Sequence, residues 1–286
     1  MSVQTLAAWL RCPNCVKALE PIEDAAGEVL GCASGHRFDV NRRGYVTLLP
    51  PRSRVVGDSA AMLDEREALL ASGAYAPIRD ALIAAVRPSR PRTVLDSGTG
   101  TGWYLHGLLD AISAASGQQA RGLASDLSPA AVARAVRGRP DVDGLVADVH
   151  APLPVRDAVA DAVTVVFAPR NPAEFARVLR SGGVLAIVVP RADHLAELRA
   201  IGGMLDVPDG KAGSVEASLA EWFLPTAAQH VRYELPLNPE RARQLQGMGP
   251  SAHHVVRSPE SAAQLAASDL PASVTVSVDV LAFTRR

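Results

Sequence analysis

All the cysteines of this chain lie within its first 32 residues, and they are spaced as metal ligands. A C-x2-C pair is followed, after a spacer, by C-x3-H, and the residues concerned are Cys12, Cys15, Cys32 and His36. Three thiolates and one imidazole are a natural tetrahedral set for Zn²⁺. Because four protein ligands close the coordination shell, no position is left for a reacting water. We therefore expect a structural zinc site.

Ordinary reduced core cysteines are the alternative interpretation. Such residues should be scattered along 286 residues, but no cysteine follows Cys32. The odd number of cysteines argues against a disulfide framework. A segment this short would bury too little apolar surface to fold alone, so the metal would supply part of its stability.

A second candidate site is a glycine-rich loop, D-x-G-x-G-x-G, at the end of the apolar run 93–97. Its defining residues are Asp96, Gly98, Gly100 and Gly102. Glycines let the backbone turn sharply and approach a ligand closely. An acidic residue would repel a pyrophosphate, but it suits the ammonium and sulfonium groups of S-adenosylmethionine. The loop resembles motif I of the class I S-adenosylmethionine-dependent methyltransferases.

Two further carboxylates end the apolar runs that follow. Asp126 could accept two hydrogen bonds from a ribose diol. In the fold that motif I resembles, Asp148 would contact the adenine amino group, and residues 180–183 resemble its L-x-P-G-G turn. Each aspartate alone is more commonly a helix N-cap or a solvated loop residue. Three of them at strand ends favour a cofactor site.

The pattern of apolar runs indicates the elements that position these residues. We expect strands at 93–97, 120–126, 143–148, 162–167 and 183–190, with helices such as 128–138 and 172–180 between them. This alternation predicts a parallel sheet covered on both faces. The last strands, 229–235 and 273–284, lack such a crossover. The expected fold class is α/β: a Rossmann-like class I methyltransferase sheet, mostly parallel with an antiparallel C-terminal strand, and a small N-terminal zinc-binding module.

Composition and local sequence suggest the domain division. Residues 1–49 form the expected metal module, 50–58 a linker rich in Pro and Arg, and helices follow at 59–73 and 76–86. We therefore predict a zinc-binding module with linker at 1–58, whose arginines favour RNA recognition, and a methyltransferase domain at 59–286. A net charge of −1 gives no global basic field. The chain has no apolar run long enough for a transmembrane helix and no secretory leader, so we expect no membrane contact and a cytoplasmic protein.

A local arginine cluster accompanies the metal module. Against Asp39 alone, residues 37–54 contain Arg37, Arg42, Arg43, Arg52 and Arg54. Arginines beside a zinc knuckle suit phosphate and stacking contacts with looped RNA. A solvated linker is the alternative.

The combination of these features resembles one family over nearly the whole chain. The zinc module is followed by F-D-V…G-Y-V-T-L-L-P (38–50), G-D-S-A (57–60) and motif I, and this order resembles the 23S ribosomal RNA guanine-N1 methyltransferases of the RlmA family. The resemblance implies methylation of N1 of a guanine in a 23S rRNA hairpin loop, and a homodimer whose cleft accepts RNA. Segments 167–175 and 247–254 look more like a branch that confers resistance to macrolides of the tylosin and mycinamicin type.

The resemblance also implies roles for individual residues. The family's zinc ligands match the Cys₃His set above, and its cofactor contacts match Tyr75, Gly100, Thr101 and His194. A packing aromatic and a surface histidine are the alternatives for Tyr75 and His194. Many members carry Cys and Glu where this chain has Thr99 and Thr101, which makes Asp96 the more important anion here.

The sequence does not identify a catalytic base. N1 of guanine carries a proton, so a base, or stabilisation of a developing O6 anion, is needed. We interpret Asn171 as loop structure, because the run N-P-A-E lacks an aromatic that would stack a base; contact with the guanine is the alternative. His253 and His254 could meet RNA or be exposed loop residues.

Two other functions remain open at this point. One is a small-molecule methyltransferase with a structural zinc knuckle. The other is a non-enzymatic zinc RNA-binding protein, against which the intact Asp96, Gly98, Gly100 and Asp126 argue.

Overall fold

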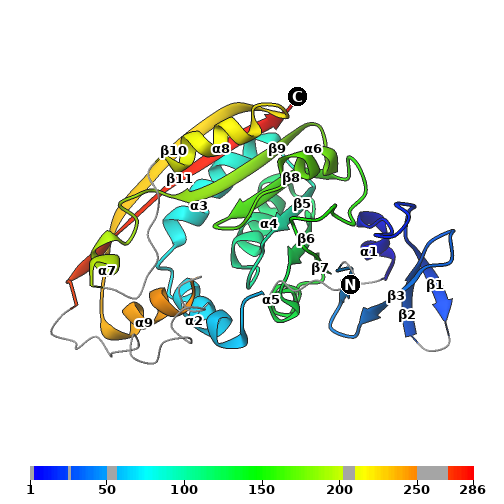
Figure 1. Cartoon of the computed structure of the whole chain (residues 1–286), viewed down its shortest axis with the longest axis horizontal. Helices are drawn as coiled ribbons and strands as arrows, with labels where there is room; N and C mark the ends of the chain where they lie inside the picture. Colours follow the sequence, from blue (N-terminus) through cyan, green and yellow to red (C-terminus); the bar gives the residue numbers. More distant parts are fainter. Residues whose placement is uncertain (1–2, 25–26, 50–56, 202–209, 250–269) are drawn as a thin grey trace.

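One mixed sheet of 11 strands runs through the computed structural model, which describes residues 3–24, 27–49, 57–201, 210–249 and 270–286 (Figure 1). The strand order is β1-β2-β3-β4-β7-β6-β5-β8-β9-β11-β10. The strands are β1 (Glu20–Asp24), β2 (Gly27–Gly31), β3 (Arg37–Asn41), β4 (Tyr45–Thr47), β5 (Thr93–Ser97), β6 (Arg121–Asp126), β7 (Val142–Val146), β8 (Ala160–Val166), β9 (Leu179–Pro190), β10 (Phe223–Pro236) and β11 (Ser273–Arg285).

The centre of the sheet is parallel, as the alternation of strands and helices predicts. Strands β4, β7, β6, β5, β8 and β9 pair in parallel, whereas β11 is antiparallel to both β9 and β10. The predicted fold class is therefore confirmed. All the loops that follow β5, β6, β7 and β8 lie at one edge, called here the carboxyl edge, where ligands of such sheets bind.

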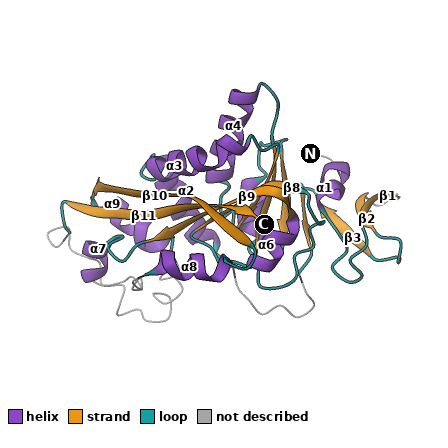
Figure 2. Cartoon of the chain, turned by 90° about the horizontal axis from the view of Figure 1, so that it is seen from above, coloured by secondary structure: helices purple, strands orange, loops and turns teal. Residues whose placement is uncertain are grey.

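Helices cover both faces of the sheet. They are α1 (Val3–Trp9), α2 (Ala60–Ala71), α3 (Ala76–Val86), the short 3₁₀ helix η1 (Arg87–Ser89), α4 (Trp103–Ser116), α5 (Pro129–Ala135), α6 (Pro172–Val178), α7 (Ala196–Ala200), α8 (Lys211–Leu219) and α9 (Pro239–Gly247). Buried residues of α3, α4 and α5 share one core, and those of α1, α6 and α8 share the other. Figure 2 shows α3 and α4 on one side of the sheet and α8 on the opposite side. Successive residues of β5 divide between the cores, Val94 to the first and Leu95 to the second, as alternation in a strand requires.

The N-terminal module is continuous with this sheet. Its last strand, β4, pairs in parallel with β7, and Val46 lies beside Leu145. Residues 147–159, which connect β7 to β8, contain no helix. Helix α1 supplies apolar side chains such as Leu6 and Trp9 to that face instead. The module therefore contributes side chains to the second core of the sheet and is not a separate appendage.

The predicted elements agree closely with the observed ones at the sheet centre. The helix predicted at 76–86 and the strand at 93–97 have those bounds. The turn expected at 180–183 lies inside β9, where the pairing passes from Ala160–Leu179 to Ala162–Val184. Gly182 there has a φ of 71°, which allows the irregularity.

In the part of the chain that the structure describes, no single helix is both long and apolar enough to cross a membrane. The pair Ala60–Ala71 and Ala76–Ser89 passes that test together, but it is bent by 81°.

Candidate functional site

The predicted metal ligands converge within the N-terminal module. The ligand atoms of Cys12, Cys15, Cys32 and His36 all lie within 4.8 Å of one another. The Sγ atoms of Cys15 and Cys32 are 3.6 Å apart, and Nδ1 of His36 lies 3.4 Å from Sγ of Cys32. Zn–S and Zn–N bonds of about 2.3 and 2.0 Å give tetrahedral edges of about 3.5 to 3.8 Å. The cluster therefore has the size and the donor set of a closed zinc site.

The surroundings of Cys15 favour the thiolate, the form that binds metal. A backbone hydrogen bond from Lys17, followed by the Ser34 side chain, lowers the pKa of Cys15 to about 6. Burial has the opposite effect on Cys12 and raises its pKa. A bound cation would offset that burial cost.

The glycine loop after β5 turns in a way that requires its glycines. Gly98, Gly100 and Gly102 have φ values of 76°, 54° and 80°, all in the left-handed region. A Cβ on Gly98 would lie 2.3 Å from Cβ of Ala168, so the loops after β5 and β8 are in close contact. A Cβ on Gly102 would also lie 2.9 Å from Cα of Ala135 in α5, so packing adds to the conformational need for a glycine there.

Asp96 lies in β5 directly before this loop and is 2% exposed. Its Oδ1 accepts a hydrogen bond of 2.6 Å from the Thr164 hydroxyl. Burial disfavours the charged form of this carboxyl group and is the main reason why its pKa is raised to about 6. A cationic ligand would stabilise the carboxylate, as the sequence argument expects.

Asp126 and Asp148 occupy the next two strand ends of the same edge. Asp126 accepts hydrogen bonds of 2.9 Å from the amides of Gly100 and Ser128, and burial raises its pKa. Asp148 accepts from the amide of His150 at 2.9 Å. The structure thus brings all three predicted carboxylates to one edge, where two of them also order local turns.

Tyr75 and His194 are buried and lie in one aromatic cluster with the exposed Phe167, which the sequence did not single out as a site residue. The Tyr75 side chain is 1% exposed, and its hydroxyl has no hydrogen-bond partner in the described part of the chain. Such an orphaned buried polar atom fits a position that contacts a ligand. The Tyr75 ring is 6.3 Å from those of His194 and Phe167. Phe167 follows β8 directly, and its exposure could not be inferred from an apolar run.

Asn171 is loop structure, as interpreted from the sequence. Its amide nitrogen donates to the carbonyl of Val149 at 2.8 Å, and its Oδ1 accepts from the amide of Glu174 at the start of α6. The side chain is therefore committed to ordering the backbone. His253, His254, Arg52 and Arg54 lie outside the described residues.

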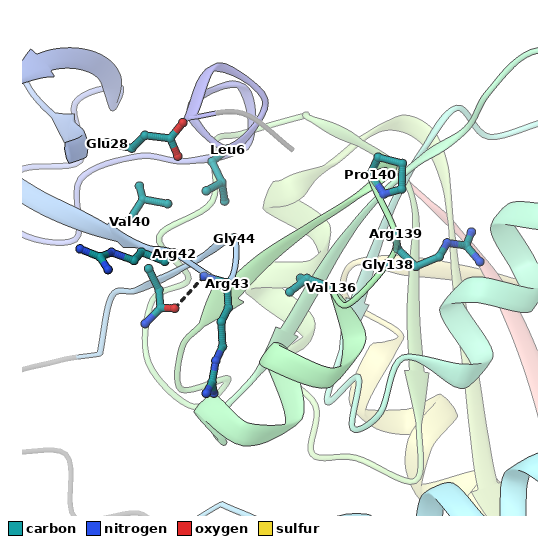
Figure 3. A pocket seen from close by; sticks show the side chains of 11 residues that line it. Leu6, Glu28, Val40, Arg42, Arg43, Gly44, Val136, Gly138, Arg139 and Pro140 are labelled. Atoms are coloured by element: carbon teal, nitrogen blue, oxygen red, sulfur yellow. Dashed lines mark hydrogen bonds between the residues drawn. The ribbon is translucent and has the colours of Figure 1, made fainter.

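The other three predicted RNA-binding arginines lie at two different edges of the module, Arg42 and Arg43 at one and Arg37 at the other. Arg42 and Arg43 line a groove of about 390 Å³ between the β3–β4 turn and residues 138–140, which precede β7 (Figure 3). Because β4 and β7 are parallel, this groove lies at the amino ends of the strands, opposite the carboxyl edge. Arg37 begins β3, which runs antiparallel to β4, and so it lies toward the carboxyl edge.

Comparisons with known proteins agree with both halves of the structure. Residues 10–54 match the sequence family described as RlmA, N-terminal, and residues 94–183 match a methyltransferase domain. The chain is 39% identical to the 23S rRNA (guanine(748)-N(1))-methyltransferase of Streptomyces fradiae, over 88% of each chain. It is 40% identical, over 96% of each chain, to a Micromonospora griseorubida protein provisionally named a 23S rRNA (guanine-N(1)-)-methyltransferase. The chain belongs to the 23S rRNA (guanine-N1)-methyltransferase family.

Family membership confirms the predicted cofactors. Enzymes of this 23S rRNA (guanine-N1)-methyltransferase family use S-adenosylmethionine, and their N-terminal ribbon carries a structural zinc. The fold has a solved counterpart in a chain of the complex between the Haloferax volcanii Trm112 methyltransferase activator and its provisionally assigned methyltransferase. That match has a TM-score of 0.52 at 19% identity and covers 81% of this chain and 98% of the other.

Proposed function

We propose that this enzyme transfers the methyl group of S-adenosylmethionine to N1 of a guanine in a hairpin loop of 23S rRNA. The observation that carries the proposal is near-full-length similarity to the Streptomyces fradiae enzyme, whose name specifies N1 of guanine 748. The Cys₃His cluster and the aspartates at the carboxyl edge of the sheet, all present in this chain, support the proposal. Small-molecule methylation and RNA binding without catalysis are correspondingly disfavoured.

We assign the methyl donor to the carboxyl edge of the sheet. When bound there, S-adenosylmethionine supplies an electrophilic methyl group on a sulfonium. Asp96 would face its positive charge, Asp126 its ribose and Asp148 its adenine. Gly98, Gly100, Thr101 and Gly102 would form the turn around it, and Tyr75 and His194 would close the pocket. In the overall reaction, a C–N bond forms at N1 as the C–S bond breaks, and the N1 proton leaves to a base or to water.

Methyl transfer to rRNA is the direct test. The zinc-loaded protein is incubated with labelled S-adenosylmethionine and an unmodified 23S rRNA transcript that contains guanine 748. We expect label in one guanine, detected as a reverse-transcription stop because N1 methylation blocks base pairing. An Asp126→Ala variant serves as the control and should transfer little label. Label in no RNA, or on another atom of guanine, would contradict the proposal.

We also propose that methylation protects a host from macrolides of the tylosin and mycinamicin type. Because the name of the Streptomyces fradiae relative specifies guanine 748, this guanine is the first position to test. Expression in a susceptible bacterium should raise the inhibitory concentration of tylosin, whereas the Asp126→Ala variant should not. Methylation without any change in susceptibility would assign the enzyme to ribosome maintenance instead.

The remaining sequence predictions stay proposals of the same kind. They are a cytoplasmic location, a homodimer, a boundary at residue 58 and RNA contacts from Arg37, Arg42, Arg43, Arg52 and Arg54. Arginines at both edges of the module would suit an RNA that passes along it, because phosphate contacts position a substrate without reading its sequence. Salt dependence of RNA affinity in single arginine variants tests each one.

A further inference from the structure

Phe167 is an exposed aromatic residue held in a strained backbone conformation. It directly follows the central strand β8, the residue is 40% exposed, and its φ of 53° lies in the left-handed region. Residues other than glycine adopt that region rarely, and such strain tends to gather at functional sites. Its amide donates to the carbonyl of Val188 in the next strand at 3.2 Å. The sheet therefore holds this turn in place.

The Phe167 ring rests on a rigid base. It is stacked on the His194 ring, with 5.9 Å between centroids and 25° between planes, within the range of favourable aromatic pairs. His194 is itself buried, and its Nδ1 accepts a hydrogen bond of 3.2 Å from the Ser277 amide. Leu195, the next residue, also has a positive φ of 53°. The supporting imidazole is thus fixed, while part of the Phe167 ring remains open to another flat ring.

Phe167 lies beside the glycine-rich loop that follows β5, to which we assign the methyl donor. Its neighbour Ala168 approaches Gly98 so closely that a Cβ on Gly98 would overlap it. A base lying on the Phe167 ring would therefore be next to the loop assigned to the methyl donor.

Three residues after Phe167, Arg170 also has no evident structural role. Arg170 is half-buried, and its guanidinium makes no hydrogen bond or ion pair with the described part of the chain. Burial lowers its pKa with no counteracting partner. Removing a cation from water without pairing it is costly. An anion that arrives with the substrate would provide the missing partner.

We propose that Phe167 and Arg170 form the seat of the target nucleotide. The guanine stacks on the Phe167 ring, and the Arg170 guanidinium pairs with negative charge on that nucleotide, carried by its phosphate or by O6 as N1 loses its proton. This inference rests on the proposed function. A base in an RNA loop is already partly unstacked, and an aromatic platform replaces the stacking that it loses on entering the enzyme.

The test for Phe167 compares two RNAs. A 23S rRNA hairpin containing guanine 748 is used intact, and again with an abasic site at the guanine that the wild type methylates. We expect Phe167→Leu to weaken binding of the intact RNA by about tenfold, the effect typical of one lost base–aromatic stack, and to leave the abasic RNA unaffected. Phe167→Trp should retain binding of both.

A matched control is available at the opposite edge of the sheet. Trp222 precedes β10 and is 38% exposed, close to the value for Phe167. Trp222→Leu should leave both affinities unchanged. Unaltered affinity for S-adenosylmethionine, measured by calorimetry, shows that Phe167→Leu is folded. Equal weakening for both RNAs, or loss of cofactor affinity instead, would overturn the stacking role.

Arg170→Gln separates the two sources of negative charge. A phosphate contact predicts weaker RNA binding with a salt slope reduced by about one and an unchanged kcat. A contact with O6 predicts a kcat lowered by about tenfold or more with unchanged RNA affinity, because that charge develops during the reaction. Unchanged values of both would overturn the role of Arg170.

The inference and the proposed function fail in different ways. A wild type that labels no guanine in 23S rRNA would remove the proposed function. A wild type that labels its guanine, with Phe167→Leu and Arg170→Gln equal to it in rate and affinity, would remove only the nucleotide seat.

Discussion

At the scale of single residues, the buried Asp96 makes stability and ligand binding oppose each other. Burial raises its pKa to about 6, above the usual 3.8, so between pH 4 and 6 the native state binds protons that the unfolded state releases. Stability from this group is therefore present at low pH and is lost as pH rises through 6. At neutral pH the protein holds a buried carboxylate, and its proposed place beside the cationic methyl donor would account for it.

Asp96→Asn should reverse that balance. At pH 7.5 we expect the variant to be more stable than the wild type by roughly 1 to 3 kcal/mol, with a much smaller difference at pH 4.5. The asparagine can still accept the Thr164 hydrogen bond. Affinity for S-adenosylmethionine should fall at least tenfold. Denaturant unfolding at both pH values and calorimetry check these effects, and a destabilised variant at pH 7.5 would contradict the argument.

At the scale of elements, α1 is fastened to the sheet by a buried carboxylate. Asp143 in β7 is 0% exposed and accepts hydrogen bonds from Thr5 at 2.6 Å and from Nε1 of Trp9 at 3.1 Å. Arg121 of β6 pairs with the same carboxylate at 3.3 Å. These contacts orient α1 over the face that has no helix between β7 and β8.

Asp143→Ala should release α1 from this face. We expect a loss of about 3 kcal/mol in the free energy of unfolding, because the indole N–H and the guanidinium would lose a buried partner. Asp110→Ala removes an exposed partner of Arg139 and should cost less than about 1 kcal/mol. Chemical denaturation of the two variants checks the contrast, and similar losses in both would show that α1 is held by apolar contacts alone.

At the scale of the whole molecule, the zinc ribbon and the methyltransferase sheet share one core. Cys12 and Leu30 of the module lie in the same cluster as Leu95 and Leu145 of the sheet. Metal binding in the module should therefore stabilise the entire chain, since zinc binds the folded state preferentially.

Removal of zinc by a strong chelator should lower the melting temperature of a single transition. Calorimetry and far-ultraviolet circular dichroism should report the same midpoint, with and without metal. A Cys15→Ser variant should resemble the chelated protein. Two separate transitions, with only the first sensitive to chelator, would contradict a shared core.

The sequence alone determined the donor set of the zinc site and the centre of the sheet. Ligand spacing identifies the zinc set, and the alternation of apolar runs predicts strands such as 93–97, because both signals are local along the chain. Carboxylates at the ends of parallel strands must share an edge, so the grouping of Asp96, Asp126 and Asp148 also follows from the order of elements.

Only the tertiary structure decided how distant segments combine. The pairing of β4 with β7, the position of α1 and the opposite edge taken by Arg42 and Arg43 depend on contacts between segments far apart in sequence. In the sequence, Phe167 is the last residue of an apolar run predicted to be a strand. In the structure its φ is positive, and its partly exposed ring stacks on His194. Neither backbone strain nor long-range packing leaves a periodic signal in the chain, and for that physical reason the proposed seat of the target nucleotide emerged only from the folded molecule.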